Sequence, residues 1–343
     1  MSSQKKILEF NFIKAISAIG IVIFHFAVGI GNVELLPGNY PWGSVFVTIF
    51  FMVSGALLYY NYKKPENIKL FYYKRWKSLI PDFYVAFLCV YAVQVFQNRS
   101  FFYNGHPETL LLTLIGQDGY LLELIPNYYL LGEWFLGAII ILYLLYPLLA
   151  SLIEKKEIPV LFVITALYTV SLFINNPYIR DFRSVFSCVF SFVLGITIEK
   201  HKIYEHRWLA IPTLIGFIAV NFFITDSELN LTAHICGALL FFPLFAIGGL
   251  IYRCQILGKI SNFLNSLSYD IFLIHHLLII YMLKIVTPFD NILPNIVYLA
   301  TDILLIIVAA AIFSNIMKYL LHTKIFLKFE EWILAKIGQP GHT

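Results

Sequence analysis

Two ionisable side chains lie inside an apolar run near the N-terminus, and they are the residues best suited to chemistry. Lys14 and His25 both fall within segment 10–30. Eleven residues of α-helix make about three turns plus 20°, so both side chains share one face, about 16 Å apart along the axis. A cation near one end and a titratable imidazole near the other suit a long anionic ligand that lies between them. The alternative is packing alone, with Lys14 reaching the polar interface and His25 hydrogen-bonded within a bundle.

Other apolar runs also carry polar residues, which are costly in hydrocarbon and therefore candidates for function. Glu133 and Trp134 begin one run, and either Glu133 or His234 is expected to orient His25 or an acceptor. Ser54 and Gly55 give a second run a small-residue surface that favours close approach of a helix or a ligand. Three further runs carry His234, His275, His276 and Asp302.

The segment 69–81 is the most densely basic part of the chain. Lys74, Arg75 and Lys77 surround Trp76. These residue types could hold the phosphates of a nucleotide and stack on its adenine. A cluster of charges beside anionic lipid would have the same composition.

Composition indicates the elements that must position these residues. Of 343 residues, 59% are hydrophobic and 13% are charged, whereas about 25% are charged in a typical soluble domain. The sequence therefore predicts an all-α membrane protein of about ten transmembrane helices, each needing roughly 20 apolar residues. The expected spans are 10–30, 43–62, 79–97, 129–151, 158–175, 183–199, 208–224, 232–252, 267–286 and 294–320.

The basic residues predict the orientation of these spans. With a cytoplasmic N-terminus, 19 of the 24 Lys and Arg residues fall on the cytoplasmic side and four outside, with Lys14 inside the first span. Cytoplasmic loops carry such an excess of positive charge, so both termini are expected in the cytoplasm. Topology thus explains the basic residues, and no nucleic-acid partner is expected.

The chain is expected to divide into a transmembrane domain, 1–322, and a cytoplasmic amphipathic tail, 323–343. In the tail, Lys324, Lys328 and Lys336 alternate with apolar residues, which favours a helix on the membrane surface, although a frayed tail fits nearly as well. The four cysteines show no paired spacing, so no metal site is expected. Walker, dinucleotide-binding, zinc-protease and serine-hydrolase motifs do not occur.

Five segments together resemble the acyltransferase-3 family of bacterial membrane acyltransferases. They are KAISAIGIVIFH (14–25), FFMVSGALL (50–58), YKRWKSLIP (73–81), WFL with YLLYP (134–136 and 143–147) and SYDIFLIH (268–275). The family usually has Arg where Lys14 stands, and Ala138 and Ile139 replace an acidic pair that often follows the WFL motif.

The resemblance implies transfer of an acyl group, by default acetyl, from cytoplasmic acyl-CoA to a hydroxyl of an extracytoplasmic cell-surface polysaccharide or its lipid-linked precursor. The expected location is the bacterial inner membrane. It implies that His25 and Glu133 are catalytic and that the acetyl-CoA donor is bound by Lys14, Ser54, Lys74, Arg75, Lys77, Trp134 and His275. A polytopic carrier or flippase for lipid-linked sugars, or a scaffold in an export complex, would explain the hydrophobicity and topology equally well.

Overall fold

The computed structural model of the protein describes residues 7–31, 36, 42–122, 124–174, 183–223, 229–289 and 291–338. Within these ranges the chain is helical and has no strand. The predicted all-α class is therefore confirmed. Lys5, Lys6 and Arg180, which entered the charge count, lie outside the described residues.

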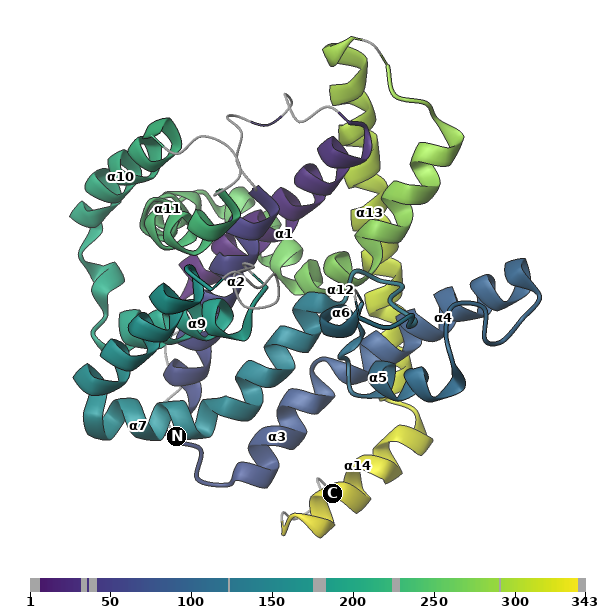
Figure 1. Ribbon diagram of the computed structural model, residues 1–343, viewed down its shortest axis with the longest axis horizontal. Coiled ribbons are helices and arrows are strands. Elements are labelled where there is room, and N and C mark those ends of the chain that lie inside the picture. The colour runs from purple at the N-terminus through teal and green to yellow at the C-terminus, as the bar shows by residue number, and fades with distance from the viewer. Residues whose placement is uncertain are drawn as a thin grey trace.

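The helices differ widely in length (Figure 1). Short 3₁₀ turns cover Pro107–Thr109, Ile203–Glu205 and Arg207–Leu209. The α-helices are α1 (Leu8–Gly29), α2 (Trp42–Tyr62), α3 (Ile68–Lys77), α4 (Ile80–Asn98), α5 (Leu110–Leu114), α6 (Asp118–Leu121), α7 (Trp134–Ser171), α9 (Val185–Lys200), α10 (Ala210–Phe223), α11 (Leu229–Ile251), α12 (Gln255–Ile285), α13 (Ile292–Leu321) and α14 (Lys324–Lys336).

Seven helical segments of the described chain are long and apolar enough to cross a membrane, so the chain is a multi-pass membrane protein. The three other predicted spans differ from these seven for identifiable reasons. Span 158–175 is the second part of α7, which continues past a non-helical residue at Lys156 and contains Pro159. Spans 183–199 and 208–224 correspond to α9 and α10, which have 16 and 14 residues. The number ten thus depends on one kinked helix and two short ones.

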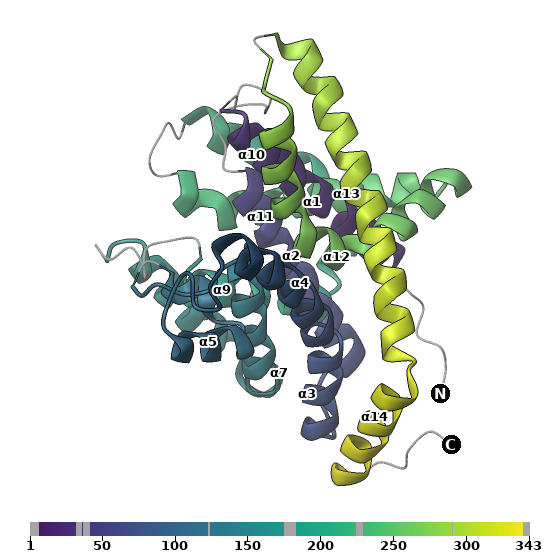
Figure 2. The same cartoon turned by 90° about the vertical axis from the view of Figure 1, so that its right-hand side faces the viewer.

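Helices α1 and α2 lie at the centre of the bundle. They pack against each other, and both contact α11. On one side α1 packs against α12, which packs against α13, and on the other side α2 packs against α9, which packs against α7. Figures 1 and 2 show α13 as a long helix at the edge of the assembly. The first helix, which carries Lys14 and His25, is therefore surrounded by protein.

Two glycines allow α2 and α9 to lie very close together. A Cβ atom at Gly55 would overlap the carbonyl oxygen of Phe192, and one at Gly195 would overlap the carbonyl of Met52. Small residues let helix backbones approach in a membrane. The close helix approach predicted at Ser54-Gly55 is confirmed.

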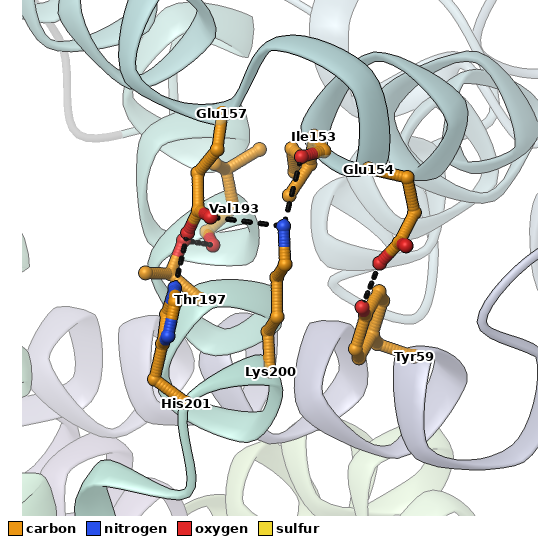
Figure 3. A network of polar contacts seen from close by, with 8 residues as sticks. All are labelled: Tyr59, Ile153, Glu154, Glu157, Val193, Thr197, Lys200 and His201. Carbon is orange, nitrogen blue, oxygen red and sulfur yellow. Dashed lines mark hydrogen bonds and ion pairs between the residues drawn. The ribbon is translucent and has the colours of Figure 1, made fainter.

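A polar network joins α2, α7 and α9 at one end of the bundle (Figure 3). The Glu157 carboxylate pairs with Lys200 at 2.9 Å and with His201 at 2.6 Å. Lys200 also donates to the carbonyl of Ile153 at 2.9 Å, and the Tyr59 hydroxyl donates to Glu154. All these contacts hold the kinked part of α7 against the ends of α2 and α9. We call this set the α7 clasp.

Candidate active site

Three histidines from two helices meet inside the bundle, and we call them the histidine cluster. His25 comes from α1, and His275 and His276 come from α12. The ring centroid of His25 is 4.0 Å from that of His276 and 5.2 Å from that of His275. One ring nitrogen from each residue lies within 4.8 Å of the other two. Two of the predicted site residues, His25 and His275, are therefore in contact.

His275 presents one unpaired nitrogen to the cluster. Its side chain is buried, and Nδ1 lies 2.8 Å from the carbonyl oxygen of Phe272 and 3.2 Å from that of Ile271. A carbonyl can only accept, so Nδ1 must carry the proton, and Nε2 must then have a lone pair. Nε2 is buried and has no hydrogen-bond partner within the described part of the chain. An unpaired buried acceptor is costly and therefore marks a position where a partner is expected to bind.

A turn before α7 packs directly on the cluster. Gly132 has a φ of +76°, and a Cβ atom there would overlap the His276 ring, so only glycine fits. Glu133 is fully buried, and its carboxylate accepts hydrogen bonds from the backbone N–H groups of Leu130 at 3.2 Å and Leu131 at 2.7 Å. Glu133 thereby holds the turn that positions Gly132 against His276.

The loop that leads into this turn has a polar core of its own. The Thr113 hydroxyl lies 3.2 Å from the Asp118 carboxylate, and Asn127 donates to the backbone carbonyl of Asp118 at 2.9 Å. Burial raises the pKa of the Asp118 carboxyl to about 6. The loop before α7 is therefore sensitive to pH at a buried carboxyl group.

A cavity of about 240 Å³ lies beside Lys14. Its lining includes three of the predicted site residues, namely Lys14, Ser54 and Arg75, together with Tyr143 and Ser268. Tyr143 is hydrogen-bonded to Ser54 and to Arg75. Residues from α1, α2, α3, α7 and α12 thus surround one chamber, which we call the Lys14 cavity.

Arg75 lies between the Lys14 cavity and a second, mainly apolar cavity of about 550 Å³. Its guanidinium carbon lies 5.5 Å from the ring centroid of Tyr62, 6.0 Å from that of Phe71 and 5.7 Å from that of Tyr143. Arg75 Nε is buried without a hydrogen-bond partner among the described residues. Aromatic rings hold this guanidinium in place, its Nη2 donates to the Tyr62 hydroxyl at 3.5 Å, and the Nε–H remains available for an anion.

The other predicted phosphate ligands, Lys74 and Lys77, do not line the Lys14 cavity. Lys74 is exposed to solvent. Lys77 pairs with Glu330 of α14 at 2.5 Å, and Trp76 packs on Phe329 of the same helix with ring centroids 6.0 Å apart. Figures 1 and 2 both place α14 near the end of α3. The segment predicted as an amphipathic tail is thus a helix that docks on the basic helix.

A group of phenylalanines lies where the Lys14 cavity approaches the histidine cluster. Phe50, Phe135 and Phe272 line the cavity, whereas none of the three histidines does. The rings of Phe135 and Phe272 are 5.0 Å apart between centroids, and the ring of Phe272 is 6.0 Å from that of His275. Phe272 therefore contacts both regions, and a ligand passing from Lys14 to His25 must move these aromatic rings.

Trp134 lies apart from the Lys14 cavity. It is the first residue of α7, next to the turn at Gly132, and its ring lies 6.4 Å from those of Phe51 and Phe135. His234 also belongs to another region, because its Nδ1 lies 2.6 Å from the Ser191 hydroxyl and 3.4 Å from that of Thr48.

Several residues of the site were missed or undervalued in the sequence. His276 lies one position beyond the SYDIFLIH segment, and only its neighbour His275 was assigned to the site. Gly132 carried a usable signal, because a glycine just before Glu133 and a helix start suggests a turn with positive φ. Nothing in the sequence links Glu330 to Lys77, which is 253 residues away.

These observations define a multi-pass membrane protein with an interior cavity that holds cationic side chains close to a cluster of imidazoles. A comparison with protein families matches residues 7–315 to the acyltransferase domain of the acyltransferase-3 family. The chain therefore belongs to that family, and it is a membrane acyltransferase. Neither the curated proteins nor the solved structures contain a match to this chain. Helix α14 lies beyond the matched residues.

Proposed function

We propose that the protein is an O-acetyltransferase of the bacterial inner membrane. It takes an acetyl group from cytoplasmic acetyl-CoA and transfers it to a hydroxyl of an extracytoplasmic or lipid-linked cell-surface polysaccharide. One observation carries the proposal: the Lys14 cavity, with its cationic side chains, reaches Phe272, whose ring also packs against the histidine cluster. The proposed topology has both termini in the cytoplasm, which puts Arg75 toward the donor side and His25 toward the acceptor side.

The donor-binding role rests on the position of the cations. Arg75 and Lys14 line the same cavity, and a guanidinium binds phosphate oxygens through paired N–H groups. The pantetheine arm of CoA, about 15–20 Å when extended, is comparable to the distance of about 16 Å from Lys14 to His25 along the helix. Ser54 and Tyr143 would line the path of this arm. Lys74, Lys77 and Trp134 would then contribute from outside the cavity, through charge at its mouth or through packing.

The chemical step is proposed to use His25 as a general base. Its imidazole accepts the proton of the acceptor hydroxyl, and the hydroxyl oxygen attacks the thioester carbonyl carbon. The C–S bond then breaks, and the proton passes from His25 to the CoA thiolate. The Nε2 lone pair of His275 would accept a hydrogen bond from the imidazolium of His25 and so stabilise it. The short distance between the two rings and the unpaired Nε2 among the described residues support this role. Glu133 acts through the turn that supports His276.

The proposal is tested by release of free CoA from acetyl-CoA by the purified protein in detergent, measured with a thiol reagent. CoA release that increases when isolated surface polysaccharide is added, with acetyl ester formed on the glycan, supports the enzyme. Movement of lipid-linked glycan across a vesicle membrane without CoA release would instead support the carrier. If neither CoA release nor glycan movement is detected, the scaffold role remains.

A further inference from the structure

The histidine cluster has the composition of a metal site as well as of a catalytic one. Three imidazoles lie together, although no metal site was expected from the sequence. We propose that His25, His275 and His276 bind a transition-metal dication of the zinc type, and that the bound ion blocks acyl transfer. The binding part of this inference stands on the geometry alone, and the inhibitory part rests on the proposed function of His25.

The arrangement of nitrogens fits a three-histidine site after a small adjustment. In tetrahedral zinc sites the Zn–N distance is about 2.0–2.1 Å, which places the ligand nitrogens about 3.3 Å apart. The three nitrogens of the cluster lie within 4.8 Å of one another. Shifts of about 1 Å, within reach of side-chain rotation, would complete the site. His25 and His276 are only half-buried, so a fourth position remains for water or an anion.

The surroundings of His275 match those of a metal ligand. A ligating histidine usually donates its second ring N–H to a carbonyl or carboxylate, which fixes the tautomer and aims the other nitrogen at the metal. Here Nδ1 lies 2.8 Å from the carbonyl of Phe272, and Nε2 is buried without a partner in the described residues. Gly132 packs on the His276 ring and limits its movement.

The donor type selects the class of ion. Neutral imidazoles bind zinc, copper and nickel, whereas calcium and magnesium prefer carboxylate, carbonyl and water oxygens. A metal on His25 would use the lone pair that must accept the proton of the acceptor hydroxyl. The same cluster therefore cannot hold the ion and act as the base at the same time.

The test measures binding of Zn²⁺ to the purified protein by calorimetry, with Co²⁺ absorption as a report on coordination geometry. The exposed cysteines Cys89 and Cys254 are replaced by Ser beforehand, because exposed thiols also bind zinc. We expect one equivalent of Zn²⁺ bound. The affinity should be more than about 100-fold lower in His276→Phe, because this substitution removes a ligand, and loss of a ligand's hydrogen-bond partner alone costs about 10–100-fold. His322→Ala, at an exposed histidine in the turn after α13, should bind as the parent does.

A second measurement needs no variant of the cluster. Zn²⁺ should slow the modification of His25 and His276 by diethyl pyrocarbonate, mapped by mass spectrometry, and leave the exposed His322 equally reactive. Absence of stoichiometric binding, equal affinity in His276→Phe, or no protection of the cluster would overturn the proposal. Inhibition of CoA release by Zn²⁺ that is reversed by a chelator supports the inhibitory part. Zinc binding without CoA release by the metal-free protein would refute the proposed enzyme and leave the metal site standing.

Discussion

The α7 clasp and the histidine cluster are both groups of polar side chains that join different helices, but they differ in how completely these side chains are paired. In the clasp, Glu157 bridges Lys200 and His201, and Lys200 also reaches a backbone carbonyl (Figure 3). In the cluster, Nε2 of His275 has no partner within the described residues. Paired polar groups stabilise a structure, whereas an unpaired buried group costs free energy and is retained where a ligand or a reaction supplies the partner.

The comparison makes opposite predictions for the two regions. A substitution in the clasp should lower stability and leave the chemistry intact. A substitution in the cluster or the Lys14 cavity should lower activity and leave the fold intact.

Among the residues that support His25, the largest effect is expected at His275. His275→Phe keeps a buried ring but removes the Nε2 acceptor, and a hydrogen bond to a charged group contributes about 1.5–3 kcal/mol. We expect kcat to fall about 10- to 100-fold with the KM for acetyl-CoA unchanged, measured by CoA release. A rise in KM with an unchanged kcat would show that His275 binds the donor and does not support the base.

A smaller effect is expected for Arg75, which lines the Lys14 cavity. Arg75→Ala should raise the KM for acetyl-CoA about tenfold, because it removes a charged contact to phosphate. Lys74→Ala is the matched control, since Lys74 neighbours Arg75 in sequence but is exposed and outside the cavity. Equal KM values for Arg75→Ala and Lys74→Ala would show that a position in the lining of the Lys14 cavity does not determine which cation binds CoA.

In the clasp, Glu157→Gln should lower the free energy of unfolding by about 1 kcal/mol, because Lys200 and His201 lose their ion-pair partner. Thermal unfolding in detergent, followed by tryptophan fluorescence, measures the loss. The exposed Glu108→Gln serves as control. CoA release per folded molecule should match the parent, and a large drop in kcat would remove the distinction between the two regions.

A pH dependence of stability is expected in the loop before α7. The pKa of Asp118 is raised to about 6 in the folded protein, so its contribution to stability is fully present below about pH 4 and is lost as pH rises through 6. Asp118→Asn stays neutral, and the variant should therefore lose this dependence and gain stability above pH 6. The melting temperatures of the parent and of Asp118→Asn are measured between pH 4 and 7. Parallel curves of melting temperature against pH would contradict this role of Asp118.

The sequence predicted features that depend on local pattern. Apolar runs located the helices. The 11-residue spacing predicts one shared face for Lys14 and His25; Lys14 lines the cavity, whereas His25 lies in the histidine cluster beyond Phe272. The small residues at Ser54-Gly55 predicted the close approach of another helix. In each case the periodicity of a single helix or the size of a side chain was enough.

The features that were missed depend on contacts between distant segments. The third imidazole, His276, matters only because α1 and the turn at Gly132 pack against α12. The ion pair of Lys77 with Glu330 forms because α14 folds back on α3. No local pattern encodes such contacts. The non-helical residue Lys156, by contrast, lies between the two expected spans 129–151 and 158–175 within α7.

The central claim is that His25 carries the chemistry, and the rate of CoA release by His25→Ala tests it most directly. Parent, His25→Ala and the exposed-histidine control His322→Ala are compared at equal protein levels and with thermal unfolding recorded. We predict that His25→Ala loses at least about 100-fold in rate, as expected for removal of a general base, while its unfolding temperature and the activity of His322→Ala stay normal. Turnover by His25→Ala at the rate of the parent would contradict the account.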